Sequence, residues 1–166
     1  MPFILVRVDD RMIHGQVVVG WGSAIHPDRI ILCHDEISAN SWEKKLYECS
    51  FSDSQCKICV FSSEELIRYK NSSDFLKEKS LLLFETPEAA LRLYDAGIKF
   101  DCLNIGGIHY QESKQELNNY IYVDAEDVQS IYQLQKRSVM IEGQDVPNAK
   151  KVNIYKLIEK KSLNFR

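Results

Sequence analysis

The sequence predicts a single α/β domain over residues 1–166, with an open, mostly parallel sheet that is covered by helices on both faces. Short apolar runs of strand length alternate with amphipathic stretches along the whole chain, without repeats or a low-complexity linker. The first apolar run, residues 3–8, is almost continuous, as expected for a strand covered on both faces. A chain of 166 residues can also bury a proper core.

The predicted strands are short apolar segments bounded by polar or turn-forming residues. The segment 120–123 is shorter than the others and is expected at an edge of the sheet. The predicted strands are residues 3–8, 29–33, 57–61, 80–84, 101–105, 120–123 and 139–142.

Helix-start and helix-stop residues frame the predicted helices. Thr86 and Pro87 favour a helix that Gly97 ends, and Asp124 is the expected N-cap of a helix through Arg137. In the stretch 38–49, apolar side chains recur at helical spacing on one face. The remaining predicted helices cover residues 16–25 and 38–49 (apolar face Trp42, Leu46 and Cys49), a segment around 64–69 capped by Ser62 or Ser63, and a closing helix marked by Ile154, Leu157 and Ile158.

Composition narrows the classes of function. The formal net charge is −3, so the chain has no basic field that would recruit nucleic acid or an anionic membrane. The longest apolar runs are of strand length, too short to span a bilayer. The N-terminal MPFILVRVDD lacks the features of a secretory signal, so we expect a cytoplasmic protein.

The five cysteines suit reduced thiols, because an odd count without a signal peptide does not form a disulfide framework. Cys56 and Cys59 have the spacing of half a zinc site, but no second pair follows. Cys59 also leads into an apolar run. We therefore expect burial and no metal, with a metal or redox role as the alternative.

Ligands of parallel sheets gather at the carboxyl ends of the strands. This rule selects five polar segments that follow predicted strands. They are residues 9–16, 34–36, 62–63, 85–86 and 104–107.

The first of these segments carries an unusual charge density in the stretch VRVDDRMIHGQV, residues 6–17. His14 precedes a predicted helix, where unpaired N–H groups favour an anion, above all a phosphate. Arg11 adds a fork of donors suited to phosphate oxygens, and both features favour a neutral imidazole. A neutral ring nitrogen is a nucleophile, so a phosphoryl group on His14 could be held by Arg11 and the amides. Asp10 or Asp9 could then hydrogen-bond the other ring nitrogen or fix Arg11, and Gly15 would let the backbone come close.

Two other interpretations stay open on the residues alone. Asp9, Asp10, Arg7 and Arg11 could form an ion-pair network in which His14 merely starts a helix. His14 could also be the general base of a hydrolase, although the sequence has no G-x-S-x-G nucleophile elbow. Neither a P-loop nor a G-x-G-x-x-G motif suggests nucleotide binding.

The stretch around His14 resembles the signature of the IIB components of the mannose/fructose/sorbose family of the bacterial phosphoenolpyruvate-dependent phosphotransferase system. The resemblance covers essentially the whole chain. It extends to Trp21, Asp35-Glu36, Asn104-Ile105-Gly106-Gly107, Asn118-Asn119 and Val123-Asp124-Ala125-Glu126-Asp127.

The resemblance implies a protein-N(pi)-phosphohistidine–sugar phosphotransferase. His14 would accept a phosphoryl group from a phosphohistidine of a IIA protein and pass it to a sugar held by membrane IIC and IID proteins. It implies Arg11 as the charge stabiliser and Asp10 as an orienting group, no metal or organic cofactor, and a cytoplasmic protein that docks on the inner face of the membrane. The residues expected to bind or support the phosphoryl group are Asp9, Gly15, Gln16, Gly106 and Gly107.

Two departures from the family pattern concern predicted partner-facing loops. Asn40 stands where many relatives carry an aspartate, and the segment Gln111-Glu112-Ser113-Lys114 lacks the usual glycine. They put the sugar and the partner in question more than the phosphorylation. The oligomeric state is open, a homo-oligomer included. So are two other functions: a regulatory phosphocarrier that signals through phospho-His14 without sugar transport, and a pure binding module.

The remaining polar residues have simpler structural interpretations. His26 is expected in a surface loop, whereas His34 and His109 follow strands and could border the site. Asp35-Glu36 is expected to belong to a helix start, and Gly106-Gly107 to a tight turn. The solvated face of the last helix would carry Lys156, Lys160 and Lys161.

Overall fold

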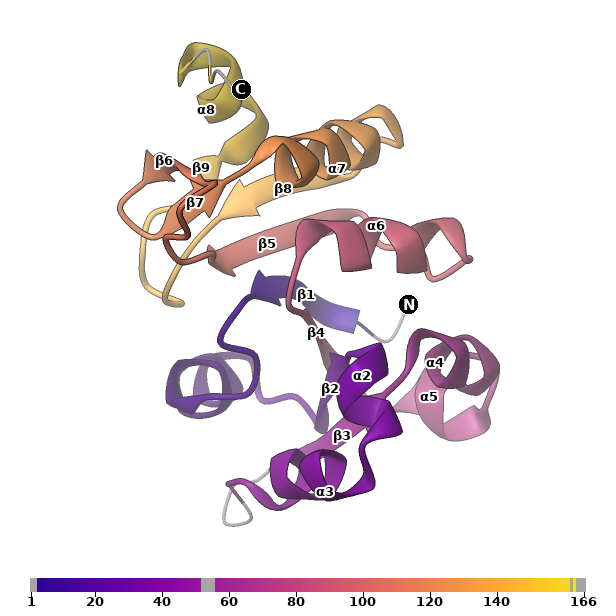
Figure 1. Cartoon of the computed structure of the whole chain (residues 1–166). Helices are drawn as coiled ribbons and strands as arrows, with labels where there is room; N and C mark the ends of the chain where they lie inside the picture. The colour runs from indigo at the N-terminus through magenta and orange to yellow at the C-terminus, as the bar shows by residue number, and fades with distance from the viewer. Residues whose placement is uncertain (1–2, 52–55, 162, 164–166) are drawn as a thin grey trace.

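The chain forms an α/β fold around a seven-stranded, mostly parallel sheet, which confirms the predicted fold class (Figure 1). The structure is a computed structural model that describes residues 3–51, 56–161 and 163. The strand order is β3-β2-β4-β1-β5-β8-β9, and all neighbours are parallel except β8 and β9. The strands are β1 (Phe3–Asp9), β2 (Arg29–Cys33), β3 (Lys57–Phe61), β4 (Ser80–Phe84), β5 (Cys102–Gly107), β8 (Met140–Gly143) and β9 (Val152–Asn153).

A separate antiparallel pair, β6 (Gln115–Asn118) and β7 (Ile121–Val123), lies beyond the end of β5. The predicted strand over residues 120–123 therefore exists as β7, but it pairs with β6 and is not an edge strand of the main sheet. Besides its pairing with β6, Ile121 forms an isolated parallel bridge to Ile108, the residue after β5. Neither β6 nor the two-residue β9 shows the apolar alternation on which the prediction of strands depends.

The helix caps expected from the sequence are present. Side chains of Ser62, Thr86 and Asp124 each accept a hydrogen bond from the backbone N–H three residues later. Gly97 follows its helix with a φ of 100°, a conformation that glycine adopts readily. The helices are η1 (Gln16–Trp21, with π-type bonding), α1 (Gly22–Ile25), α2 (Asp35–Ala39), α3 (Ser41–Cys49), α4 (Ser63–Tyr69), α5 (Ser73–Lys77), α6 (Pro87–Asp95), α7 (Ala125–Lys136) and α8 (Ile154–Lys161).

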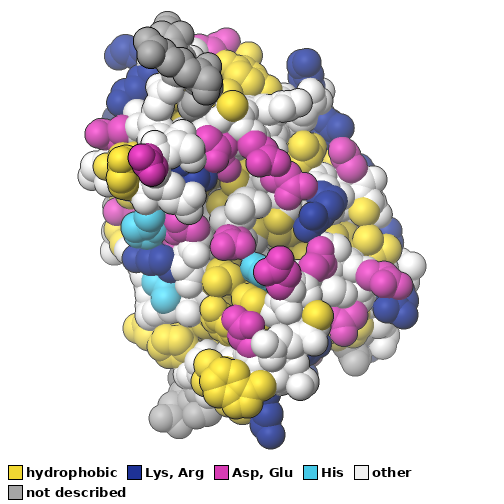
Figure 2. All heavy atoms as spheres, in the orientation of Figure 1, with side chains coloured by type: hydrophobic (Ala, Val, Ile, Leu, Met, Phe, Trp, Pro, Cys, Tyr) yellow, Lys and Arg dark blue, Asp and Glu magenta, His cyan; other side chains and the backbone are white. Residues whose placement is uncertain are grey.

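The prediction of one continuous helix over residues 38–49 is wrong. Asn40 has an extended backbone, with φ −94° and ψ 100°, and divides the segment into α2 and α3. Its side chain accepts from Glu43 N at 3.2 Å and so caps α3. The apolar face of α3 points to solvent rather than into the core, because Trp42 is 73% and Leu46 55% exposed. Figure 2 shows hydrophobic side chains at the surface where Figure 1 places α3.

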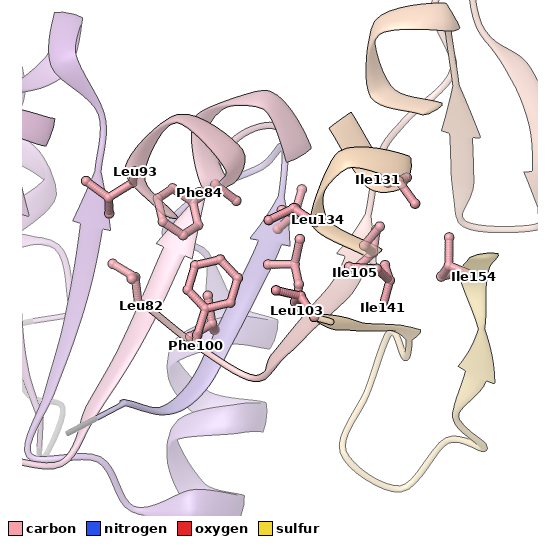
Figure 3. Close-up of a cluster of buried hydrophobic side chains, with 14 of the residues drawn as sticks. Leu82, Phe84, Leu93, Phe100, Leu103, Ile105, Ile131, Leu134, Ile141 and Ile154 are labelled. Atoms are coloured by element: carbon pink, nitrogen blue, oxygen red, sulfur yellow. The ribbon is translucent and has the colours of Figure 1, made fainter. Parts of the chain in front are cut away.

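Two apolar clusters cover the two faces of the sheet. On the first face, Leu82 and Phe84 of β4 pack with residues of α6 and α7, and Figure 3 shows Leu93, Ile131 and Leu134 reaching toward the strands. On the second face the alternate residues of β2 and β4 pack with η1. The second cluster includes Ile30, Leu32, Leu81, Leu83, Val17, Val18 and Trp21.

The second face becomes polar over β1 and β5. Val6 and Val8 face the first cluster, so Arg7 and Asp9 face the other side, as does Asn104 of β5. All three polar side chains are fully buried. The fold therefore builds a buried polar layer directly beneath the carboxyl ends of its central strands.

Candidate functional site

The segment between β1 and η1 is held tightly at the carboxyl edge of the sheet. Asp10 N donates to Gly107 O at 3.1 Å, and Met12 N donates to Asp9 O at 2.9 Å. Met12 has a φ of 57°, a left-handed conformation that costs a methionine on the order of 1 kcal/mol. The next residues bring His14 to the start of η1, where its carbonyl accepts from Val17 N and Val18 N at 3.0 Å.

Asp9 is the centre of the site. Its Oδ2 accepts from Arg7 Nη2 at 3.1 Å, and its Oδ1 accepts from the backbone N–H of Arg11 at 3.3 Å and from Arg11 Nε at 3.2 Å. His14 Nε2 lies 3.8 Å from Oδ2. One buried carboxylate therefore arranges the two arginines and the histidine.

The His14 ring has one engaged and one free nitrogen. Nδ1 lies 2.9 Å from the carbonyl oxygen of Met12, and because a carbonyl only accepts, Nδ1 carries the proton in this arrangement. Nε2 then carries the lone pair and has no hydrogen-bond partner among the described residues. The side chain is 19% exposed. Nε2 itself is buried beside Asp9, so the ring must turn before this lone pair can act as a nucleophile.

Arg11 lies at the surface next to this ring. Its side chain is 41% exposed, and Nη2 donates to Gln16 Oε1 at 2.6 Å while Nε is held by Asp9. Gln16 and Asp9 thus fix the direction of the guanidinium. A β-carbon on Gly15 would have no neighbour within 4 Å, so the space beside His14 is open. The site combines a fixed cation, a free ring nitrogen and room for a ligand.

Arg7 supports the site from below. Its Nη1 donates to Asn104 Oδ1 at 2.5 Å and to Gln144 O at 2.8 Å, and its Nη2 donates to Asp145 O at 3.0 Å. Burial lowers the pKa of Arg7, an effect that the charge of Asp9 and its hydrogen bond oppose. The guanidinium also lies 5.0 Å from the ring centroid of Trp21. The sequence offered one signal for this role: a charged residue inside an otherwise apolar buried strand.

Gly106 and Gly107 do not form the predicted tight turn. Both belong to β5, and the pairing with β1 shifts register there: Val8 pairs with Ile105 but Asp9 with Gly107. A β-carbon on Gly106 would overlap the Arg7 guanidinium, so only glycine fits. Gly106 thus makes space for the buried cation, whereas the backbone of Gly107 holds Asp10.

Asp10 makes contacts other than those expected. Its carboxylate accepts two hydrogen bonds of 2.6 Å from His109, one from the backbone N–H and one from Nδ1 of the ring. The structure gives the position next to His14 to Asp9 and not to Asp10. The residues alone had left the two aspartates as alternatives, and the resemblance had implied Asp10 as the orienting group. The alternation of β1 favours Asp9, because Asp9 is fully buried while Asp10 lies at the rim.

The predicted ion-pair network forms for three of its four members, since Asp10 pairs with His109 instead, and it coexists with the unpartnered nitrogen of His14. Arg7, Asp9 and Arg11 form a chain of ion pairs. A network that served stability alone would not require a histidine with an unpartnered nitrogen at its end. The sequence had left the network and a site at His14 as alternatives, and the structure makes the two compatible, because Asp9 of the network contacts Arg11 and lies 3.8 Å from His14.

The other histidines differ in their roles. His34 caps α2, since Nδ1 accepts from Ile37 N at 3.3 Å, and its Nε2 then donates to Glu85 Oε2 at 2.9 Å. His26 is exposed and follows α1 in the left-handed conformation, which confirms the predicted surface loop. Asp35 lies at the start of α2, as expected, but its carboxylate accepts from Ser63 N at 2.7 Å, at the start of α4.

The lysines of the last helix and of the 111–114 segment differ in exposure. Lys156, Lys160 and Lys161 are exposed, as predicted for a solvated face. Lys114 is instead buried and donates to Asp127 Oδ2 at 2.5 Å. Burial raises the pKa of Asp127, and the hydrogen bond from Lys114 opposes that effect.

The cysteines are free thiols: Cys33 and Cys59 are buried, Cys56 and Cys102 are partly buried, and Cys49 is exposed. Burial raises the pKa of Cys33 to about 12 and of Cys102 to about 11, and it also raises the pKa of Cys59. Metal binding and redox exchange both use the thiolate, which burial disfavours here. In the part of the chain that the structure describes, no three histidine, cysteine or acidic side chains gather as a metal site.

Comparison with known proteins places the chain in a family. Residues 3–165 match the family model of the sorbose subfamily IIB component of the phosphotransferase system (PTS). This chain belongs to that family. The resemblance drawn from the His14 stretch is therefore confirmed, and within the described residues of this IIB chain no helix has the length and apolar character needed to cross a bilayer.

Individual relatives agree in sequence and fold. The IIB chain is 31% identical over 156 residues to the mannose-specific EIIAB component of Escherichia coli, covering 94% of this chain but 48% of that protein, so it spans about half of that relative. It is 29% identical to the sorbose-specific EIIB component of Klebsiella pneumoniae, covering 93% of each. The crystal structure of the IIB domain of the Klebsiella pneumoniae sorbose permease superposes with a TM-score of 0.88 at 29% identity, over 96% of this chain and 98% of that one.

Proposed function

We propose that this IIB chain is a phosphocarrier in sugar uptake. His14 accepts a phosphoryl group from the phosphohistidine of a IIA protein and passes it to a sugar in a complex with membrane IIC and IID proteins. The observation that carries the proposal is the free ring nitrogen of His14 beside Arg11, both arranged by the buried Asp9. Family membership supports the same activity.

In the first step the lone pair of the His14 ring attacks phosphorus, and the bond to the imidazole of the IIA protein breaks. Both partners in this step are imidazoles, so the transfer is close to reversible, and catalysis consists of positioning and charge neutralisation. Arg11, fixed by Asp9 and Gln16, faces the charge of the phosphoryl group. In this structure Nδ1, the N(pi) atom, is hydrogen-bonded to the Met12 carbonyl, and Nε2 is buried beside Asp9. The ring must therefore turn before either nitrogen attacks phosphorus.

The names of the relatives suggest the class of sugar. They include components specific for mannose, sorbose, fructose and N-acetylgalactosamine, from Escherichia coli, Klebsiella pneumoniae and Bacillus subtilis. The substrate proposed here is accordingly a hexose or an amino sugar. The chain would work in the cytoplasm, at the inner face of the membrane when docked on its transporter.

The test is intact-mass spectrometry after incubation with phosphoenolpyruvate, enzyme I, the histidine phosphocarrier protein and a cognate IIA domain. We expect one acid-labile phosphate on the wild type and none on His14→Ala. His26→Ala is the matched control, because His26 is an exposed histidine in the loop after α1. Phosphate on His14→Ala, or none on the wild type although the IIA domain is phosphorylated, would contradict the proposal.

A further inference from the structure

A second histidine is fixed at the rim of the site. His109 follows β5, and Asp10 holds it by two hydrogen bonds of 2.6 Å, one from its backbone N–H to Oδ2 and one from Nδ1 to Oδ1. The backbone before it is also tied, since Ile108 N donates to Tyr120 O at 3.1 Å and Tyr122 N to Ile108 O at 2.9 Å. The ring is therefore held in one orientation although it lies in a loop.

The contact with Asp10 decides the tautomer of His109. An ionised carboxylate only accepts, so Nδ1 carries the proton, and the neutral ring presents the lone pair of Nε2 away from Asp10. The side chain of His109 is 57% exposed, against 18% for Asp10. A carboxylate behind an imidazole orients the ring and stabilises the imidazolium that forms when Nε2 takes a proton.

The ring of His109 borders the same open space as Arg11. The position that a β-carbon on Gly107 would occupy is 3.7 Å from Asp9 Oδ1, 3.8 Å from Arg11 Nη2 and 3.8 Å from His109 Cε1. Cε1 is bonded to Nε2, so Nε2 lies within one bond of the atom that borders this space. Because Gly107 has no side chain, the space is free for a ligand.

His14 and His109 lie on two sides of the Asp9–Arg11 pair. His14 approaches Oδ2 of Asp9, and the space over Gly107 lies at Oδ1. Arg11 spans both oxygens, through Nε to Oδ1 and Nη2 to Oδ2. Figure 2 shows two histidine side chains with a basic side chain between them at one margin of the molecule. A phosphoryl group on His14 that is held by Arg11 would thus lie at a guanidinium that also borders the space next to the exposed His109.

We propose that His109 is the general base of the second half-reaction, an inference that rests on the proposed function. As the sugar hydroxyl oxygen bonds to phosphorus, the bond from phosphorus to the His14 nitrogen breaks and returns its electron pair to the ring. The hydroxyl proton passes to Nε2 of His109 and later to solvent, so the proton and the charge are both accounted for. The first half-reaction exchanges one imidazole for another and has no hydroxyl proton to remove. His109 therefore acts as a base only in the second half-reaction, the transfer to the sugar.

The two half-reactions give the test. His109→Gln keeps an amide that can hydrogen-bond to Asp10 but removes the base. We expect phosphate uptake from the phosphorylated IIA domain within about twofold of the wild type. Sugar phosphorylation, measured in inverted vesicles that carry the IIC and IID partners with mannose, fructose, sorbose or N-acetylgalactosamine, should fall on the order of 100-fold. His26→Gln is the control and should change neither rate.

A pH profile separates a base from a merely structural contact. The groups that face His109 are Asp10 and, across Gly107, Asp9 and Arg11. A general base shapes the pH dependence of the step that it catalyses, so the pH profile of sugar phosphorylation should change in His109→Gln, whereas the loss of a structural contact should leave its shape unchanged. Thermal unfolding confirms that the variant is folded.

Other outcomes would overturn the inference in distinguishable ways. Equal slowing of both half-reactions would make His109 a phosphoryl-binding residue, and unchanged rates would make the Asp10 contact purely structural. If the wild type takes up phosphate but phosphorylates none of the four sugars, there is no sugar hydroxyl from which His109 could take a proton, and the inference fails. Failure of the proposed function itself shows earlier, as absence of phosphate on wild-type His14.

Discussion

Arg7 Nη2 lies 3.1 Å from Asp9 Oδ2, and both side chains are fully buried. Two charges in the interior cost several kcal/mol each in desolvation unless pairing and hydrogen bonds offset that cost. Here Asn104 and the backbone carbonyls of Gln144 and Asp145 accept from Nη1 and Nη2 of Arg7, whereas its buried Nε has no partner among the described residues. The pair therefore connects the β8–β9 loop and the core to the one carboxylate that arranges His14 and Arg11.

Arg7→Met should destabilise the fold strongly. The substitution leaves Asp9 buried with its closest cation removed, which typically costs about 3–5 kcal/mol. Urea unfolding measures this loss. Arg92→Met is the matched control, since Arg92 is 53% exposed and pairs with the half-exposed Asp35, so we expect a loss of at most ~1 kcal/mol. Similar losses for both variants would contradict this account of the pair.

The two neighbouring glycines should respond differently to alanine. At Gly106 the added carbon overlaps the Arg7 guanidinium, so we expect Gly106→Ala to lose about 2 kcal/mol or more of unfolding free energy. At Gly107 the nearest atom is 3.7 Å away, so Gly107→Ala should unfold within ~0.5 kcal/mol of the wild type.

Gly107→Ala should nevertheless slow the transfer of phosphate, because its methyl group fills the space bordered by Arg11 and His109. Parallel urea unfolding and intact-mass phosphorylation kinetics on the two variants separate the effects. If Gly107→Ala took up phosphate from the IIA domain and passed it to the sugar, both at the wild-type rate, this space would have no part in the reaction.

Arg11→Lys should slow phosphate uptake by His14 about 10- to 100-fold. A lysine has one charged nitrogen and cannot hold Asp9 and Gln16 while also donating to the phosphoryl oxygens. Stability should change little, because Arg11 is 41% exposed. Quenched mass spectrometry of the phosphorylated chain gives the rate, and Arg68→Lys, a substitution at a 70% exposed arginine, is the control. A wild-type rate in Arg11→Lys would remove Arg11 from the mechanism.

What the sequence predicted well was local. The caps at Thr86 and Asp124 depend on a side chain and a backbone N–H three residues apart, and both formed as expected. The charged stretch around His14 lies at the carboxyl edge of the sheet because the strand–helix alternation places it there.

The contacts that the sequence did not predict are long-range. Asp10 meets His109, 99 residues later, and Arg7 meets the carbonyl of Gln144, 137 residues later. Such contacts depend on strand order and on a register shift at Gly106, which no local pattern encodes. The helix break at Asn40 was local but hidden, since an asparagine inside an amphipathic run can equally continue the helix.

The capping box of α4 should make stability depend on acid pH. Hydrogen bonds from the Ser38 hydroxyl at 2.6 Å and from Ser62 N at 2.7 Å lower the pKa of Glu65 below its usual 4.5, with Lys44 contributing and burial opposing. A carboxyl whose pKa is lowered by folding stabilises the fold above the unfolded value, and this contribution is lost as the pH falls through the folded value. Glu65→Gln should therefore cost about 1 kcal/mol at neutral pH and progressively less below pH 4.5. Urea unfolding across this range measures the difference, with Glu64→Gln, a substitution at an 80% exposed glutamate, as the control. A cost for Glu65→Gln that stayed constant down to acid pH would mean that the ionised carboxylate is not what stabilises the start of α4.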